Sequence, residues 1–208
     1  MAEQKDHRFR LLAAPGQELK VYGSGDLTRP LVENSKGIIF PYTPNINLTF
    51  SAEYGTMDLT HVNDVQNFFN KRSNLSINID GIYSCQTSRE AHYALAVFHC
   101  LTSLTMMRFG ANDPLRGTPP PILYFYGYGK YVFNGVPVIV ESFNVNFSNN
   151  VDVIEVINTY NIDEVLGYLP SVVNYVLVLK VQRKPIDYLV EFNLEKFKSG
   201  ELVKKGYR

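Results

Sequence analysis

Strict alternation of apolar and polar residues recurs in separate stretches of this chain and constrains the fold more than any other feature. It covers NINLTFSAEY at 45–54, LSINIDGIYSC at 75–85 and VPVIVESFNVNF at 136–147. Successive strand residues point to opposite faces of a sheet, so this period predicts half-buried strands. SVVNYVLVLKVQ at 171–182 predicts a last long strand. The step from Gly81 to Ile82 predicts a bulge that shifts the phase of the second strand.

One stretch has helical periodicity instead, and it predicts a helix over about residues 88–108. Thr87 is a suitable N-cap, and Glu90 stands at the capping-box position. Gly110 is a natural stop. Ala96 and Met106 lie opposite the main apolar face, so we expect this helix to be covered on more than one side. The main apolar face consists of Ala94, Val97, Phe98, Leu101 and Leu104.

Proline and glycine mark the connections between the strands. Pro119–Pro121 lack amide donors and hold φ near −65°, so they predict an extended spacer and exclude a central strand. Asn134–Gly135 is a strong turn signal and predicts a hairpin that joins residues 130–133 to 136–147. Residues 55–73 show no core periodicity and predict a long loop that orders against a partner.

These elements predict a mainly β fold with one central α-helix and antiparallel connections, either a β-sandwich or a half-barrel. We expect an extended N-terminal arm at 1–36, with a short strand at Leu19–Tyr22, and a β domain at 37–183. The C-terminal tail at 184–208 is expected to hold a short helix near Phe192–Lys198. Arm and tail are polar, so we expect them to order against neighbouring subunits.

Composition limits the classes of function. Hydrophobic residues make up 45% of the 208, which is typical of a folded globular protein. The formal net charge is zero, which gives no general electrostatic reason to bind nucleic acid or an anionic membrane. Cys85 and Cys100 form no zinc motif, and we expect reduced thiols in a reducing compartment. The charged first ten residues are unlike a signal peptide, and no apolar run is long enough to span a membrane.

The search for catalytic motifs finds little. His92 and His99 are seven residues apart on the predicted helix, whereas helical metal pairs prefer a spacing of four. His61 lies in the predicted loop with no evident nucleophile. Two alternatives to a non-enzymatic assembly protein stay open: an acidic hydrolase site and a carbohydrate-binding aromatic platform. The acidic residues are Asp152, Glu155, Asp163 and Glu164, and the aromatic ones are Tyr124, Phe125, Tyr126, Tyr128, Tyr131 and Phe133.

A series of motifs in this order resembles a known family. They are FPYTPNINL, YGTMDLTH, RSN, LSINIDGIYSCQTSREAHYALAVFHCLTSLTMMRFG, DPLRGTPPPILYFYGYG, GVPVIVESFNVNF and LPSVVNYVLVLKVQ. Over residues 38–182 the chain resembles baseplate proteins of contractile-tail bacteriophages that share the tail-tube fold. The type is the adaptor ring between the tail tube and the baseplate hub, nicknamed a ripcord.

The resemblance implies a homo-oligomeric, hexameric ring whose subunits complete one β-barrel around a lumen. Its partners would be tail-tube, hub and wedge proteins, and genomic DNA would pass through without specific binding. It implies synthesis and assembly in the host cytoplasm, a place in the virion tail, no membrane, no cofactor, no metal and no catalytic residue. We expect the polar strand faces to line the lumen, at Asn47, Thr49, Ser51, Glu53, Ser76, Asn78, Asp80, Ser142, Asn144 and Asn146. We expect inter-subunit contacts at Asp58, His61, Asn63, Phe68, Phe69, Lys184, Lys196 and Lys204.

Charge is distributed unevenly along the chain. Residues 141–164 carry five acids and neither Lys nor Arg, whereas eight Lys or Arg and four Asp or Glu follow from Lys180 onward. Opposite signs at two ends of a subunit could register one copy against the next. The open alternatives to the adaptor ring are a monomeric carbohydrate-binding β-sandwich and a tail terminator or assembly factor on a related fold.

Overall fold

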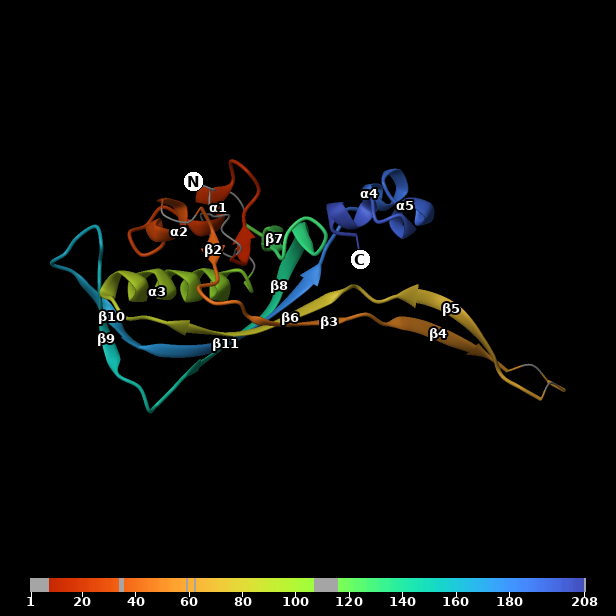
Figure 1. The fold of residues 1–208 in the computed structure, drawn as a ribbon, viewed down its shortest axis with the longest axis horizontal. Coiled ribbons are helices and arrows are strands. Elements are labelled where there is room, and N and C mark those ends of the chain that lie inside the picture. Colours follow the sequence, from red (N-terminus) through yellow and green to blue (C-terminus); the bar gives the residue numbers. More distant parts are fainter. Residues whose placement is uncertain (1–7, 34–35, 59, 62, 107–115, 208) are drawn as a thin grey trace, which may run out of the picture.

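A seven-stranded antiparallel sheet organises the computed structural model, which describes residues 8–33, 36–58, 60–61, 63–106 and 116–207 (Figure 1). Its order is β2-β1-β7-β8-β11-β6-β3. The strands are β1 (Arg10–Leu12), β2 (Ile38–Ile39), β3 (Asn45–Thr49), β6 (Ser76–Ser84), β7 (Leu123–Gly127), β8 (Phe133–Phe147) and β11 (Val172–Val181). Two small sheets pair β4 (Ala52–Met57) with β5 (Gln66–Arg72) and β9 (Val153–Ile157) with β10 (Val165–Pro170). The mainly β, antiparallel prediction is confirmed, and the described residues form no closed barrel.

The predicted helix is present as α3 (Ser88–Ser103) and lies across one face of the sheet (Figure 1). Its capping box is confirmed: Glu90 N donates to Thr87 Oγ1 at 3.3 Å, and Thr87 N donates to the Glu90 carboxylate at 3.4 Å. All five residues of the predicted apolar face are buried, and so is Ala96 on the opposite side. The helix is therefore covered on two sides, while the expected stop at Gly110 lies outside the described residues.

The core lies between α3 and the sheet. Ile77 and Ile79 of β6 and Leu177 of β11 point into it and are fully buried. The predicted bulge at Gly81 is wrong, because β6 and β11 pair without a register shift from Ser84 to Ser76. Gly81 faces Tyr175 directly, and an added Cβ would stand 2.5 Å from the Tyr175 hydroxyl oxygen. The tyrosine ring fills the space of the missing side chain, so glycine serves packing here and not a change of phase.

The N-terminal segment differs from the expected extended arm. Residues 10–12 form β1, which is inserted between β2 and β7 of the main sheet. The strand expected at Leu19–Tyr22 is wrong, because α1 (Glu18–Tyr22) occupies this place and α2 (Arg29–Glu33) follows. Buried Tyr22 favours the helix, because its hydroxyl accepts a hydrogen bond from Ala13 N at 2.7 Å and donates one to Leu11 O at 3.1 Å.

The turn between β7 and β8 also differs from the prediction. The chain turns at 128–132, with φ of 52° at Tyr128 and 82° at Gly129, instead of at Asn134–Gly135. The expected turn residues lie inside β8, where Gly135 has φ 69° beside a register shift. Phe133 explains the difference, because its buried ring packs on Phe125 at 4.9 Å and so belongs to the strand. The three prolines form a non-strand spacer, as predicted.

Two peripheral units complete the chain. Residues 55–73, expected as a loop, include most of a β-hairpin, because β4 and β5 pair along their whole length and project from the sheet (Figure 1). The C-terminal unit, residues 184–207, holds α4 (Pro185–Val190), α5 (Leu194–Lys198) and the 3₁₀ helix η1 (Leu202–Lys205), and α5 confirms the short helix expected near 192–198. Tyr207 anchors this unit, since the Arg183 guanidinium lies 3.9 Å from its ring centroid.

Among the helices of the described residues, none combines the length and the hydropathy needed to cross a membrane.

Candidate functional site

The sheet face that points away from α3 is lined by polar side chains in aligned rows. Antiparallel pairing places Asn47 opposite Asn78, Asn78 opposite Val178, and Val178 opposite Ser142. Residues that pair across strands share a face. A second row has the order Asn45, Asp80, Val176, Asn144. We call this surface the polar face: Asn45, Asn47, Thr49, Ser76, Asn78, Asp80, Ser142, Asn144, Asn146 and Asn174.

Eight of the ten residues expected in a lumen lie together on this polar face. Ser51 and Glu53 do not, because the strand expected over 45–54 breaks between β3 and β4. Glu53 lies on the projecting hairpin, where its Oε2 forms an ion pair with Lys71 Nζ at 3.2 Å. Sequence reasoning missed Asn45 and Asn174, although both continue the alternation of their strands. It also missed the ion pair between Lys180 and Glu141, which needs a bulge in the pairing of β8 with β11.

Two strand edges border the polar face. β3 ends the sheet on one side, so its outer edge has no partner strand among the described residues. On the other side β7 pairs with β8 only from Phe133 to Val138. The remainder of β8, residues 139–147, pairs with β11 alone. Unpaired strand edges are templates for pairing with another chain.

The projecting hairpin β4–β5 exposes large apolar side chains. From here on the arm means this hairpin and not the N-terminal segment 1–36. Phe69 is 60% exposed and Tyr54 is 61% exposed, and their rings meet edge to face at 5.8 Å. Every residue of β5 is exposed. The Phe68 ring covers Gly55 on the facing strand, which stabilises the hairpin locally. An isolated two-stranded hairpin is marginally stable in water, so these surfaces are suited to a contact with another molecule.

The residues expected at subunit contacts gather in two places. Asp58, His61 and Asn63 lie exposed around the tip of the arm, and Phe68 and Phe69 lie on β5.

The other three lie in the C-terminal unit. Lys184 precedes α4 and Lys196 belongs to α5, and both are exposed. Lys204 is engaged within the chain, because its Nζ lies 5.3 Å from the Tyr131 ring centroid. The contact roles of all eight residues stay predictions.

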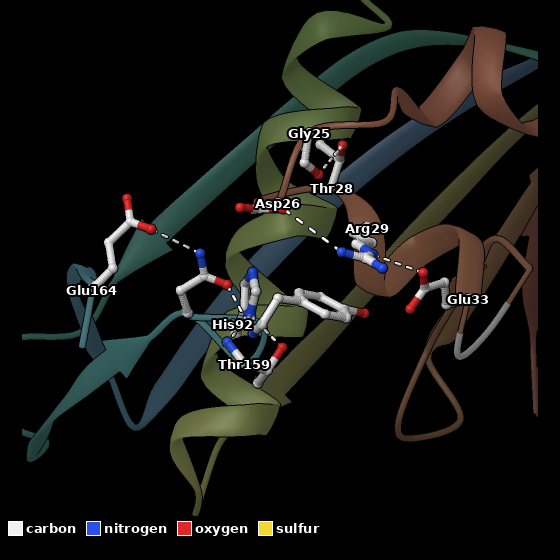
Figure 2. Close-up of polar contacts among 10 residues, drawn as sticks. Gly25, Asp26, Thr28, Arg29, Glu33, His92, Thr159 and Glu164 are labelled. Atoms are coloured by element: carbon white, nitrogen blue, oxygen red, sulfur yellow. Dashed lines mark hydrogen bonds and ion pairs between the residues drawn. The ribbon is translucent and has the colours of Figure 1, made fainter. Parts of the chain in front are cut away.

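A buried polar cluster clamps α3 to two loops (Figure 2). His92 of α3 is fully buried, and its Nδ1 lies 3.0 Å from Thr159 Oγ1 and accepts from Thr159 N at 3.3 Å. Its Nε2 has no hydrogen bond of good geometry, although it faces the backbone carbonyls of Asp26 and Leu27. Burial lowers the pKa of His92, and the Asp26 and Leu27 carbonyls offset part of that effect.

The same cluster ties α2 to the β9–β10 turn. The Arg29 guanidinium pairs with Glu33 at 2.7 Å and lies 4.3 Å from the Tyr160 ring centroid. Asn158 is fully buried and donates from Nδ2 to the Glu164 carboxylate at 2.8 Å. These contacts hold α2 and the β9–β10 turn in place.

The two cysteines and the acidic residues were also considered as reactive groups. Burial raises the pKa of the Cys85 thiol to about 11 and of the Cys100 thiol to about 12, so both free cysteines are protonated at neutral pH. The described residues contain no group of His, Cys, Asp and Glu side chains placed to hold a metal ion. Of the possible acidic site, Glu164 accepts the Asn158 hydrogen bond.

The six aromatic residues considered as a carbohydrate platform do not share one surface. Phe125 and Phe133 are buried, and Tyr128 packs edge to face on Phe9 at 4.6 Å. Tyr126 lies over Gly135, where an added Cβ would stand 3.1 Å from its hydroxyl oxygen. Two of the six rings are therefore buried, and two others are in contact with residues of the same chain.

No protein-family model matches the chain, and no curated protein shows significant sequence similarity to it.

Proposed function

We propose that the protein is a structural subunit of a closed ring, in which neighbouring copies join their sheets into one β-barrel with the polar faces toward a central lumen. The observation that carries this proposal is the pair of open edges, β3 and residues 139–147 of β8, on opposite sides of one polar face. Pairing of one edge with the other on the next copy is a head-to-tail contact, which generates a ring when the rotation closes. Closure would also remove both edges.

β3, β6 and β8 suit this role because each has one apolar and one polar side, whereas the outer side of β11 carries Val176 and Val178 beside Asn174. The inward residues of β6 and β11 belong to the core, and Ile46 and Leu48 of β3 are partly buried against it, so the other side of the sheet is the one free to face water. Barrels formed from such strands enclose an aqueous lumen when they are wide enough. The resemblance in sequence to tail-tube-like baseplate proteins suggests a ring of six copies at the junction of tail tube and baseplate in a contractile phage tail.

The chemistry of the polar face is compatible with passage of DNA. Its residues are mostly amides and hydroxyls. At its border Lys180, which pairs with Ser76 across the strands, forms an ion pair with Glu141, and Asp80 adds a negative charge. A lumen rich in unpaired Lys or Arg would bind phosphate and slow transit, whereas this surface has little attraction for it.

Cross-linking across the two edges tests the proposal. Asn47 of β3 and Asn144 of β8 are replaced together by cysteine. Within one chain β3 and β8 are three strand spacings apart, about 14 Å at ~4.8 Å each, beyond the reach of a disulfide. The oxidised double variant should form disulfides between neighbouring copies, because cross-strand neighbours approach to about 5 Å. On a denaturing gel these links should give a ladder of linked chains whose largest member has the number of copies in the ring.

The matched controls are Asn47→Cys and Asn144→Cys alone, which should not link, since in a head-to-tail contact neither residue meets its own copy. Buried Cys85 and Cys100 are not expected to compete. Mass measurement and electron microscopy of the wild-type protein at high concentration give the ring size independently. A chain that stays monomeric, with no linked species from the double variant, would contradict the proposed function.

A further inference from the structure

The helix α4 presents its apolar stripe to solvent, which is the reverse of an ordinary surface helix. Ile186, Leu189 and Val190 lie at positions i, i+3 and i+4 and are all strongly exposed, with Leu189 at 84%. Leu194, at the start of α5, is also exposed. An amphipathic helix that turns such a stripe outward is suited to a partner surface.

The C-terminal unit does not need this stripe for its own packing. Leu202 and Tyr207 form its buried part. Tyr207 Oη donates to Asp187 O at 2.9 Å, which holds α4 to the buried part of the unit, although α4 itself has no buried residue. Asn134 of β8 donates from Nδ2 to Lys204 O at 2.9 Å and fixes the unit to the sheet. The unit is therefore anchored on one side and leaves the stripe of α4 free.

A second surface with exposed apolar side chains lies on the β9–β10 hairpin. Leu169 and Val156 are buried, whereas Val153, Glu155 and Tyr168 point outward, and Tyr168 is 71% exposed. Tyr168 and Glu155 are a directly opposed cross-strand pair, so they share this outer face. An isolated apolar residue on a surface is ordinary, but an aromatic ring beside Val153 on a short hairpin is suited to a contact.

The two units differ in the sign of their net charge. Residues 131–179, which include the β9–β10 hairpin, contain five acids and neither Lys nor Arg. The C-terminal unit, residues 184–207, carries five lysines against four acids, and Lys184, Lys196 and Lys198 are exposed. Its own Glu191 is paired with Lys205 at 3.6 Å. Facing surfaces of opposite sign favour correct docking and disfavour contact of either surface with itself.

We propose that the apolar stripe of α4 in one copy docks on the outer face of the β9–β10 hairpin of the next copy. The two units lie at opposite ends of the sheet in Figure 1, so one chain cannot bring its own two surfaces together. A contact between different surfaces of identical chains is head-to-tail and has the polarity of the ring. This inference rests on the proposed function and names a second contact, outside the barrel wall.

A double-cysteine variant tests the inference. Leu189→Cys and Tyr168→Cys are placed in one chain, which is oxidised at a concentration where the wild-type protein is assembled. A ladder of disulfide-linked chains is expected, and neither single variant should link to itself. Both side chains are largely exposed, so circular dichroism melting of the variants should match that of the wild type.

Charge reversal provides an independent measurement. Lys196→Glu with Lys198→Glu should raise the concentration at the assembly midpoint by about tenfold or more, because like charges then face each other. Asp152→Lys with Glu155→Lys, added to the same chain, should return the midpoint toward the wild-type value. The matched control is Lys20→Glu with Lys36→Glu, which changes the same charge away from both surfaces and should leave the midpoint unchanged.

Three results would overturn the inference. Leu189→Cys alone could link to itself, which would indicate a symmetric contact between two C-terminal units. Leu189→Cys could link to Phe69→Cys in a mixed sample, which would make the arm the occupant. The double variant could fail to link in material that has the mass of a ring, and the proposed function would then stand without this contact. If Leu189→Cys links to Tyr168→Cys but the edges of β3 and β8 do not cross-link, the proposed barrel would be wrong and the contact between α4 and the β9–β10 hairpin would stand.

Discussion

Gly81 offers the most direct test of how the sheet is packed, through the single substitution Gly81→Ala. An ideal Cβ at this position would lie 2.5 Å from Tyr175 Oη and 2.8 Å from Tyr175 Cζ. Carbon atoms in contact prefer about 3.5–4.0 Å, so the ring or the strand must move by roughly an ångström. The Tyr175 ring has little freedom to do so, because it is 2% exposed and packs on Phe40 at 5.7 Å and on Tyr83 at 5.3 Å.

The expected size follows from two opposing effects. Forcing extra volume into a packed core costs about 1–3 kcal/mol. Replacing glycine by alanine in a strand recovers about 0.5–1 kcal/mol of backbone entropy. The difference of the two ranges is about 0–2.5 kcal/mol, and because the Tyr175 ring cannot move freely we expect Gly81→Ala to lower the free energy of unfolding by about 1–2 kcal/mol. For a chain of this size that corresponds to a decrease in Tm of about 2–8 °C.

Denaturant unfolding of dilute protein measures the effect, with Gly25→Ala as the matched control. Gly25 has no atom within 4 Å of its added Cβ, so its substitution should change stability by less than about 0.5 kcal/mol. A double-mutant cycle with Tyr175→Ala identifies the cause. In the absence of the ring, Gly81→Ala should no longer destabilise, which gives a coupling of about 1–3 kcal/mol. Wild-type stability of Gly81→Ala, or an additive cycle, would refute the reasoning.

Three further predictions concern α3. Leu101→Ala should lower the free energy of unfolding by about 2–5 kcal/mol in thermal or denaturant melts, because Leu101 is fully buried, whereas exposed Thr105→Ala should have little effect. Thr87→Ala removes the capping box and should cost about 0.5–2 kcal/mol by the same measurement, and a helix of unchanged stability would contradict the capping role. The folded pKa of His92 is lowered below its unfolded value near 6.5, so the neutral ring contributes its full stability above that pH and loses it as pH falls toward the lowered pKa. Denaturant melts from pH 7 to pH 5 should show this slope in the wild type and a smaller slope in His92→Gln, and equal slopes would contradict it.

Local periodicity was sufficient to predict the parts of the fold that repeat one pattern over many residues. The helix with its Thr87–Glu90 capping box and the strands at 75–85, 136–147 and 171–182 are examples. The polar face follows from the same alternation. Eight of its residues could be named in advance because a strand with one polar side must place that side away from the core.

The remaining features depend on contacts between distant residues, which a local pattern does not contain. Alternation continues through 45–54, yet the strand breaks after Thr49, where its pairing with Ser76 ends. ELKVY fits a strand or a helix equally well, and the hydrogen bonds of Tyr22 select the helix. Which strands form the open edges could not be predicted, since an edge is defined only once every strand has found its neighbours.

The order of strands in the sheet has a consequence for the time course of folding. The central strand β11 lies between β8 and β6 but is the last strand in the chain. During synthesis β6 and β8 leave the ribosome well before the strand that joins them, and at about 5–20 residues per second this interval lasts several seconds for β6. During that interval β6 and β8 each lack β11, their shared pairing partner. The sheet can form as a whole only after Val181 has emerged, so a nascent chain cannot present both open edges on one sheet before then. In the proposed ring, synthesis itself would thus delay recruitment of neighbouring copies until β11 has emerged and paired.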